Sequence, residues 1–170
     1  MPKRRDSLLP LGRTAQNLLL AFVALVMLPD ERALSQSSRT LPPQVEAAIV
    51  ERRERCYPEA ASLKPGFITQ KDVNGDGVDD YILDYDKFVC GTHQSYFCGT
   101  AGCLTQIFAS LPGGAFVKVL DENVREVRFA RLKGRPAMQV ALHGGKCGRT
   151  DAEPCSVTLY WNGREFNPAD

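Results

Sequence analysis

All six cysteines of this 170-residue chain lie after Arg55, and their number and placement limit what the chain can fold into. An even set of cysteines behind a secretion signal is typical of a disulfide framework around a small core. We predict the pairs Cys147–Cys155, Cys98–Cys103 and Cys56–Cys90. The closest alternative replaces the last two with Cys56–Cys98 and Cys90–Cys103. Zinc is a competing use, because four residues separate Cys98 from Cys103 and His143 is close to Cys147.

The first 35 residues have the pattern of a signal peptide. Basic residues at Lys3, Arg4, Arg5 and Arg13 precede a mostly apolar run over 17–28, and Ala33 and Ser35 suit cleavage before Gln36. This run is shorter than the roughly 20 residues that cross a membrane comfortably. We therefore predict a signal peptide over 1–35 and one periplasmic or secreted domain over 36–170, with no membrane span after cleavage. An uncleaved anchor and a twin-arginine signal are the alternatives.

The charge of the predicted mature domain argues against nucleic acid as a partner. Residues 36–170 contain 16 Lys and Arg and 17 Asp and Glu, which gives a net charge of −1. General nucleic-acid binding needs a clear basic excess. We expect the partner to be an unknown envelope protein or polymer.

Hydrophobic periodicity predicts one helix followed by a β-rich region. Val45, Ala48, Ile49, Arg52 and Cys56 recur at helical spacing, and prolines flank the segment. The following β-branched and aromatic segments are 67–70, 81–85, 104–109, 116–120, 124–129, 137–142 and 157–161. We predict an α+β fold in which an N-terminal helix packs on a mainly antiparallel, disulfide-stapled β-sheet.

The segment 72–80 places oxygen donors at alternate positions around glycines. Its predicted metal ligands are Asp72, Asn74, Asp76, the backbone carbonyl of Val78, and Asp80. Hard oxygen donors of this kind suit calcium, which takes six to eight of them. Leu83 stands where an EF-hand has its glutamate, and the residues that follow predict a strand. We therefore expect a calcium loop that stabilises the fold, as opposed to an EF-hand. A solvated turn without metal is the alternative.

Residues 72–85 resemble the calcium loops of FG-GAP and VCBS-type repeats, in which Asp-x-Asn-x-Asp-Gly-x-x-Asp precedes a strand. The resemblance implies calcium as the bound ion. Those families have tandem copies that build propeller blades, whereas this chain has one copy. The remainder resembles small secreted bacterial domains of unknown function.

No sequence motif identifies an enzyme. The chain lacks Gly-x-Ser-x-Gly and His-Glu-x-x-His. A loop with His93, Tyr96 and Phe97 could form a binding surface, and His143 lies on a glycine-rich loop. We expect a calcium-stabilised binding or structural module without catalysis. The alternatives are an inhibitor of a cell-wall enzyme, favoured by a protruding loop, and an envelope hydrolase, favoured by a cleft with close carboxylates such as those of Asp84 and Asp86.

Overall fold

The computed structural model describes residues 40–149 and 153–169. All described residues belong to one compact unit of the chain. The predicted signal peptide lies outside the described residues. Among the described helices, none is long and apolar enough to cross a membrane.

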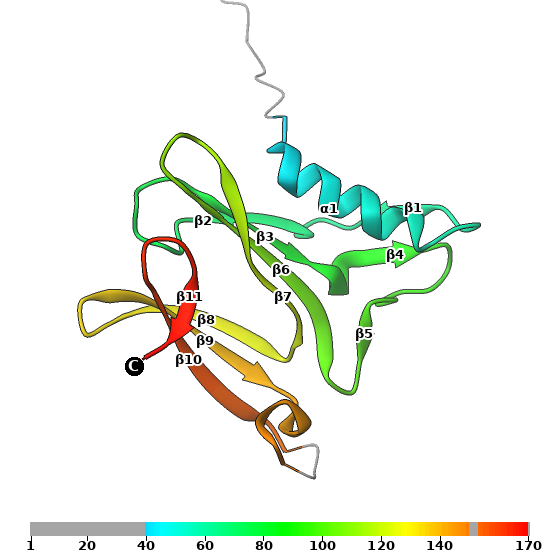
Figure 1. Ribbon diagram of the computed structural model, residues 1–170. Helices are drawn as coiled ribbons and strands as arrows, with labels where there is room; N and C mark the ends of the chain where they lie inside the picture. The colour runs from blue at the N-terminus through cyan, green and yellow to red at the C-terminus, as the bar shows by residue number, and fades with distance from the viewer. Residues whose placement is uncertain (1–39, 150–152, 170) are drawn as a thin grey trace, which may run out of the picture. The chain divides into compact units, whose positions relative to one another are not determined.

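The described chain contains one α-helix, two short 3-10 helices and eleven strands (Figure 1). The helices are α1 (Pro43–Glu54), η1 (Tyr85–Lys87) and η2 (Gly144–Cys147). The strands are β1 (Ala61–Leu63), β2 (Ile68–Lys71), β3 (Asp80–Asp84), β4 (Phe88–Cys90), β5 (Cys98–Gly99), β6 (Gly102–Ser110), β7 (Phe116–Val124), β8 (Glu126–Leu132), β9 (Arg135–Leu142), β10 (Cys155–Trp161) and β11 (Phe166–Pro168).

The strands form three antiparallel sheets. The central sheet has the order β2-β3-β6-β5, with β7 paired to the other edge of β6. The C-terminal sheet has the order β11-β10-β9-β8, and β1 pairs with β4 in a small third sheet. Arg125 alone separates the end of β7 from the start of β8, so the chain passes from the central to the C-terminal sheet at one residue.

Strand β6 lies at the centre of the fold because both of its faces are covered. Its residues from Leu104 to Ser110 are all buried. Alternate side chains of a strand point to opposite faces, so Leu104 and Phe108 join one hydrophobic cluster while Ile107 joins a second. The first cluster also holds Tyr85, Phe88 and apolar residues of α1. The second lies between the central and C-terminal sheets, where Ile107 meets Met138 and Val140.

The α+β prediction is wrong, because the domain is mostly β. Three sheets contain eleven strands, and the described residues have a single α-helix of 12 residues. The second hydrophobic cluster forms between two sheets without helical residues. The prediction failed because it assigned all seven strand segments to one sheet covered by a helix. In the structure, a second sheet covers one face of the first.

The cysteines form the three pairs that we predicted first. Cys56–Cys90 joins the chain just after α1 to the end of β4, Cys98–Cys103 closes the β5–β6 turn, and Cys147–Cys155 joins η2 to β10. No free cysteine is found in the described chain, which contains all six. The thiolates that a zinc site would require are therefore absent from these disulfide-bonded residues.

Candidate functional sites

The predicted calcium loop is wound around its own polar side chains. Asp72 accepts hydrogen bonds from the backbone N–H groups of Gly75 at 2.6 Å and Gly77 at 3.0 Å. Both glycines have positive φ angles, 81° and 85°, which glycine adopts without steric cost. These contacts fold the backbone back toward the Asp72 carboxylate and explain why the two glycines stand at these positions.

The next two predicted ligands form a second set of local hydrogen bonds. The Asn74 side-chain oxygen accepts from the N–H of Asp76 at 3.0 Å, and Asp76 Oδ1 accepts from the N–H of Val78 at 2.8 Å. Asn74 is buried, and its amide nitrogen donates to the backbone oxygen of Ser110 at 2.9 Å. One lone pair on each of these accepting side-chain oxygens has no partner in the described chain, so the oxygens retain acceptor capacity for a cation.

Asp80 differs from the other predicted ligands because it is fully buried. Its Oδ2 accepts from the N–H groups of Val73 at 2.7 Å and Asn74 at 3.3 Å. Its Oδ1 accepts from the N–H of Ser110 at 2.7 Å and lies 2.8 Å from the Ser110 hydroxyl oxygen. These contacts occupy about four acceptor positions, the full capacity of a carboxylate. A cation that used Asp80 would have to displace at least one of them.

The Ser110 hydroxyl lies between two carboxyl groups. Its oxygen is 2.7 Å from Asp76 Oδ2 and 2.8 Å from Asp80 Oδ1. A hydroxyl carries one proton, so it can donate to one of the two acids. Burial raises the pKa of Asp80 and outweighs the hydrogen bonds that lower it. Burial also acts on Asp76, but there the hydrogen bonds from Ser110 and the Val78 N–H prevail and lower its pKa.

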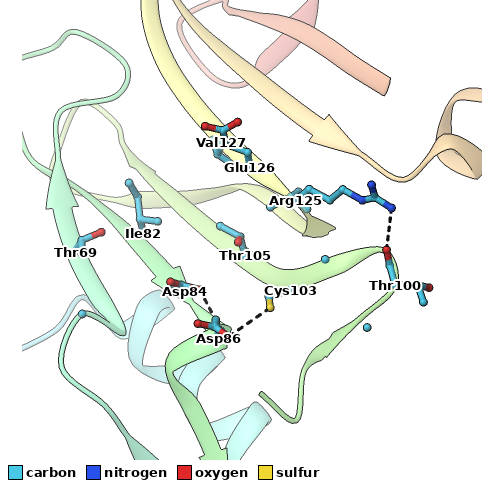
Figure 2. A pocket seen from close by; sticks show the side chains of 14 residues that line it. Thr69, Ile82, Asp84, Asp86, Thr100, Cys103, Thr105, Arg125, Glu126 and Val127 are labelled. Carbon is cyan, nitrogen blue, oxygen red and sulfur yellow. Dashed lines mark hydrogen bonds between the residues drawn. The ribbon is translucent and has the colours of Figure 1, made fainter. Parts of the chain in front are cut away.

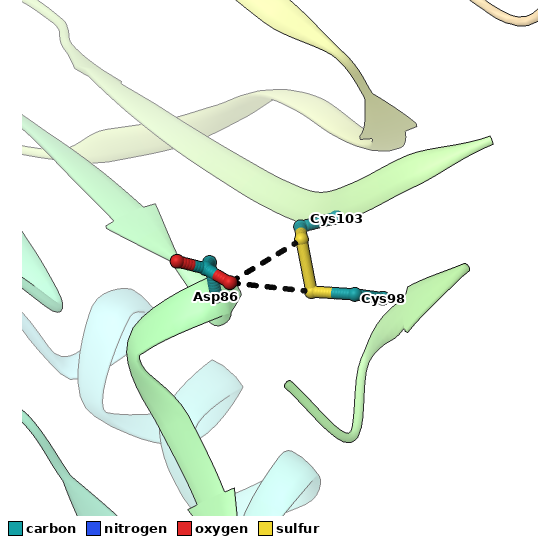
Figure 3. A group of neighbouring side chains, drawn as sticks. All are labelled: Asp86, Cys98 and Cys103. Carbon is teal, nitrogen blue, oxygen red and sulfur yellow. Dashed lines mark hydrogen bonds between the residues drawn. A yellow bond between two sulfur atoms is a disulfide. The ribbon is translucent and has the colours of Figure 1, made fainter. Parts of the chain in front are cut away.

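The structure brings Asp76 and Asp80 together on Ser110, and it leaves Asp72 in contact with the loop glycines. In the described residues, one group of three His, Cys, Asp or Glu side chains has its ligand atoms within 4.8 Å of one another. It consists of Asp86, Cys98 and Cys103. Figure 3 shows that the two sulfurs of this group are bonded to each other. A disulfide offers no thiolate, so this group is a poor metal site.

A cleft of about 650 Å³ opens between the central and C-terminal sheets. Figure 2 shows Thr69, Ile82, Asp84 and Thr105 on strands of the central sheet, with Glu126 and Val127 across from them on β8. We call this the intersheet cleft. Thr100, Gly102 and Cys103 form its rim beside the β5–β6 turn. Cys98–Cys103 therefore fixes one edge of the cleft.

Gly102 is required at this rim for two reasons. Its φ angle is 100°, where other residues are strained, and an added Cβ would lie 2.1 Å from the backbone oxygen of Val124. This close approach lets β6 pair with the end of β7 just before the chain turns into the C-terminal sheet. The glycine thus sets the shape of the cleft where the two sheets diverge.

The carboxyl groups of the cleft have different surroundings. Asp86 accepts a hydrogen bond from Ser95 at 3.0 Å and pairs with Lys87, and these two contacts lower its pKa. Glu126 pairs with Arg128 at 2.6 Å. Asp84 accepts one hydrogen bond, from the N–H of Asp86 at 3.0 Å, and forms no ion pair within the described residues. Asp84 is therefore the one of these three cleft carboxyl groups without an ion pair in the described chain.

Thr105 contributes a buried polar group to the same cleft. The residue is 9% exposed, and its hydroxyl makes no hydrogen bond to any described part of the chain. It lies directly opposite Asp84 in the β3–β6 pairing, so both side chains point to the same face. Sequence reasoning missed Thr105 and Ser110, because a threonine within a strand and a serine at its end carry no signal of their own.

The two other predicted loops have mainly structural contacts. Phe97 packs against Tyr85 and Phe88, with ring centroids 5.3 and 5.2 Å apart, and so covers the first hydrophobic cluster. Tyr96 is 49% exposed beside it, and His93 is exposed. The Nδ1 of His143 accepts from the N–H of Gly145 at 3.2 Å and caps η2. Tyr96 is thus the loop aromatic available to a partner.

No protein-family model, curated protein or solved structure matches this chain. The fold and its cleft define a disulfide-crosslinked, mainly antiparallel β protein with a polar cleft between two sheets.

Proposed function

We propose that the domain acts outside the cytoplasm as a binding module, with the intersheet cleft as its binding site and a calcium ion stabilising its loop at 72–80. The cleft carries this proposal. Its volume of about 650 Å³ falls within the range of ligand pockets, and its walls come from two sheets whose positions are fixed by a shared core. Three disulfides fit an oxidising compartment, either the periplasm or the exterior.

The calcium proposal rests on the donor set of the loop. Asp72, Asn74, Asp76 and the Val78 carbonyl are all hard oxygen donors, and the glycine turns already bring the loop around them. Two carboxyl groups share the Ser110 hydroxyl, so a nearby divalent charge would relieve their repulsion. Asp80 supports the loop through its buried hydrogen bonds. Of the predicted ligands, it would need the largest rearrangement to bind calcium.

Selective blocking of the cleft tests the binding proposal. Thr69 is exposed on β2 and lines the cleft, so Thr69→Trp should fill the cleft without disturbing the core. Gln70→Trp is the matched control, because Gln70 is an exposed neighbour on the same strand that does not line the cleft. Oxidised wild type and both variants are immobilised and exposed to envelope extract. A component retained by wild type and Gln70→Trp and lost on Thr69→Trp supports the proposal. Equal retention by all three proteins, or by none, contradicts it.

An envelope hydrolase is the second candidate, because Asp84 and Asp86 line the same cleft. Hydrolysis of a glycosidic bond by two carboxyl groups needs one of them to remain protonated as a general acid. Lys87 and Ser95 lower the pKa of Asp86, which opposes that role. The test is release of soluble fragments from purified cell-wall polymer. Fragment release that is lost in Asp84→Asn, with unchanged thermal stability, would favour the hydrolase over the binding module.

A further inference from the structure

The floor of the intersheet cleft holds two polar side chains whose hydrogen-bonding capacity the described chain does not use fully. Asp84 and Thr105 face each other on β3 and β6, and both line the cleft (Figure 2). Directly opposite residues of an antiparallel pair have Cβ atoms about 4.5–5.5 Å apart. One small donor group can therefore contact both side chains at once.

Thr105 is the stronger indication of a ligand. Thr105 is nine-tenths buried, and nothing in the described chain satisfies its hydroxyl. The hydroxyl oxygen is open to the cleft, because Arg52 Nε is the one fully buried side-chain N or O atom without a partner among the described residues, so a molecule in the cleft can hydrogen-bond to it. Thr69 adds a second hydroxyl without a hydrogen bond to the described residues, on the neighbouring strand β2.

The charged residues that line the cleft favour a cationic ligand. Three carboxyl groups line the cleft (Asp84, Asp86 and Glu126), and Arg125 is the one basic residue among the described lining. Arg125 donates to the backbone oxygen of Thr100 at 3.2 Å, at the rim. Lys87 and Arg128 pair with Asp86 and Glu126, which leaves Asp84 as the carboxylate without an ion pair in the described chain. An anion would meet repulsion at this floor, whereas a cation would be attracted.

The remaining lining distinguishes between kinds of cation. Aromatic cages typically bind quaternary ammonium groups, which have no N–H donors. None of the described residues that line this cleft is aromatic. The lining instead offers the Asp84 carboxylate and threonine hydroxyls as acceptors, which match the three N–H donors of a primary ammonium group. Ile82 and Val127 provide aliphatic surface on opposite walls for the stem that carries such a group.

We propose that the intersheet cleft binds a primary ammonium group on an aliphatic stem, with Asp84 and Thr105 as its principal acceptors. This inference rests on the proposed binding function. The same chemistry occurs in a lysine side chain of a partner protein and in a free alkyl diamine. In either case the ammonium donates to Asp84 and Thr105, while the stem lies between Ile82 and Val127.

The test is titration of the isotope-labelled, oxidised protein, followed by backbone amide shifts in NMR spectra. Butylammonium should shift the amides of Ile82, Asp84, Thr105 and Val127 in a saturable manner. Tetramethylammonium at the same concentration and ionic strength should leave them unchanged. Saturable and equal shifts with both cations, or no shifts with butylammonium, would overturn the proposal.

Variants assign the acceptors. Asp84→Asn should weaken butylammonium binding by at least 5-fold, about 1 kcal/mol by the tenfold-per-1.4 kcal/mol relation, and Thr105→Val by about 3-fold. Glu165→Gln removes an exposed acid from the loop between β10 and β11 and should leave affinity unchanged. Equal weakening in Asp84→Asn and Glu165→Gln would mean that net charge alone attracts the cation, and would refute the assigned acceptors.

Two further experiments distinguish the two possible sources of the ammonium group, and distinguish failure of the ligand proposal from failure of the binding proposal. Tighter binding of Nα-acetyl-lysine methylamide than of cadaverine indicates a lysine side chain, whereas the reverse order indicates a free diamine. If Thr69→Trp abolishes capture of an envelope component while butylammonium fails to bind, the ligand class is wrong and the binding function stands. If Thr69→Trp captures the same components as wild type, the binding function itself fails.

Discussion

The backbone N–H of Ser110 donates a hydrogen bond of 2.7 Å to the buried Asp80 carboxylate, across 30 positions in the chain. This contact ties the end of β6 to the first residue of β3, beside the 72–80 loop. Together with the N–H groups of Val73 and Asn74, it makes Asp80 the acceptor that organises the loop from inside. The loop therefore depends on Asp80 whether or not it holds an ion.

Removal of the Asp80 carboxylate should destabilise the fold strongly. Asp80→Ala leaves three backbone N–H groups without their acceptor, and we expect the free energy of unfolding to fall by about 3 kcal/mol or more. Ser110→Ala removes a hydroxyl alone and should cost about 1 kcal/mol. Urea unfolding of the oxidised protein in EDTA measures both values. Asp79→Ala is the exposed control, and a loss for Asp80→Ala as small as that of this control would contradict the anchoring role.

Calcium should raise the thermal midpoint of unfolding. A ligand at 100 times its dissociation constant stabilises the native state by about 2.7 kcal/mol, which corresponds to roughly 10 °C for a domain of this size. Asp76→Ala should abolish the shift, because Asp76 is exposed and has acceptor capacity left. Asp79→Ala should retain most of it. Identical melting curves in excess calcium and in chelator would exclude the site.

Part of this fold followed from sequence pattern, and part did not. Segments rich in β-branched and aromatic residues located β2, β3, β6, β7, β9 and β10, because such side chains favour strands. The predicted segment 124–129 runs across the boundary between β7 and β8. The short strands β1, β4 and β5 were missed, because a strand of two or three residues is too short to show a sequence pattern. The division into two sheets was also missed. It depends on Arg125, where β7 ends and β8 begins, and no glycine or proline marks that position.

The candidate sites could also be predicted only in part from the sequence. Oxygen spacing alone identified the 72–80 loop, but the burial of Asp80 depends on Ser110, which lies 30 residues away. Asp84 and Thr105 become neighbours only through the β3–β6 register. Such pairings are set by the packing of whole strands, so a single sequence does not reveal them.

Thr105→Val should not destabilise the protein. The substitution keeps the shape of the side chain and removes a hydroxyl that faces the cleft and has no partner in the described chain. We expect the free energy of unfolding to stay equal or rise by up to about 1 kcal/mol. Tyr85→Phe is the contrasting case, because its hydroxyl donates to Gln106 at 2.7 Å and both residues are fully buried. That change should cost about 1–3 kcal/mol. A large loss for Thr105→Val in urea unfolding would show that its hydroxyl has a structural role.

The disulfides should contribute unequally to stability. Loop-closure entropy predicts a larger effect for a crosslink that spans more residues, about 4 kcal/mol for Cys56–Cys90 and about 2 kcal/mol for Cys98–Cys103. Their sequence separations are 34 and 5. Double Cys→Ala variants, compared by urea unfolding, measure both contributions. Cys56 and Cys90 are also buried, so their removal should cost additional packing energy. The opposite order would show that the small bridge at the cleft rim governs stability.

Asp121 should make stability depend on pH in the acid range. Burial tends to raise its pKa, but hydrogen bonds from Lys118 and Gln106 outweigh burial and hold the pKa below its ordinary value of 3.8. The unfolded chain therefore binds a proton at a higher pH than the folded protein does. The stabilisation from Asp121 is present above about pH 4 and is lost as the pH falls through the lowered pKa.

Asp121→Asn removes this titration, so its unfolding free energy should fall less steeply than that of wild type below about pH 4. Lys118→Met keeps the carboxyl group and removes a donor, which should move the acid limb of the stability curve to higher pH. Urea unfolding from pH 2.5 to 6 in EDTA measures all three proteins without a metal contribution from the loop. If the three curves stay parallel through this range, Asp121 is not a source of the acid dependence.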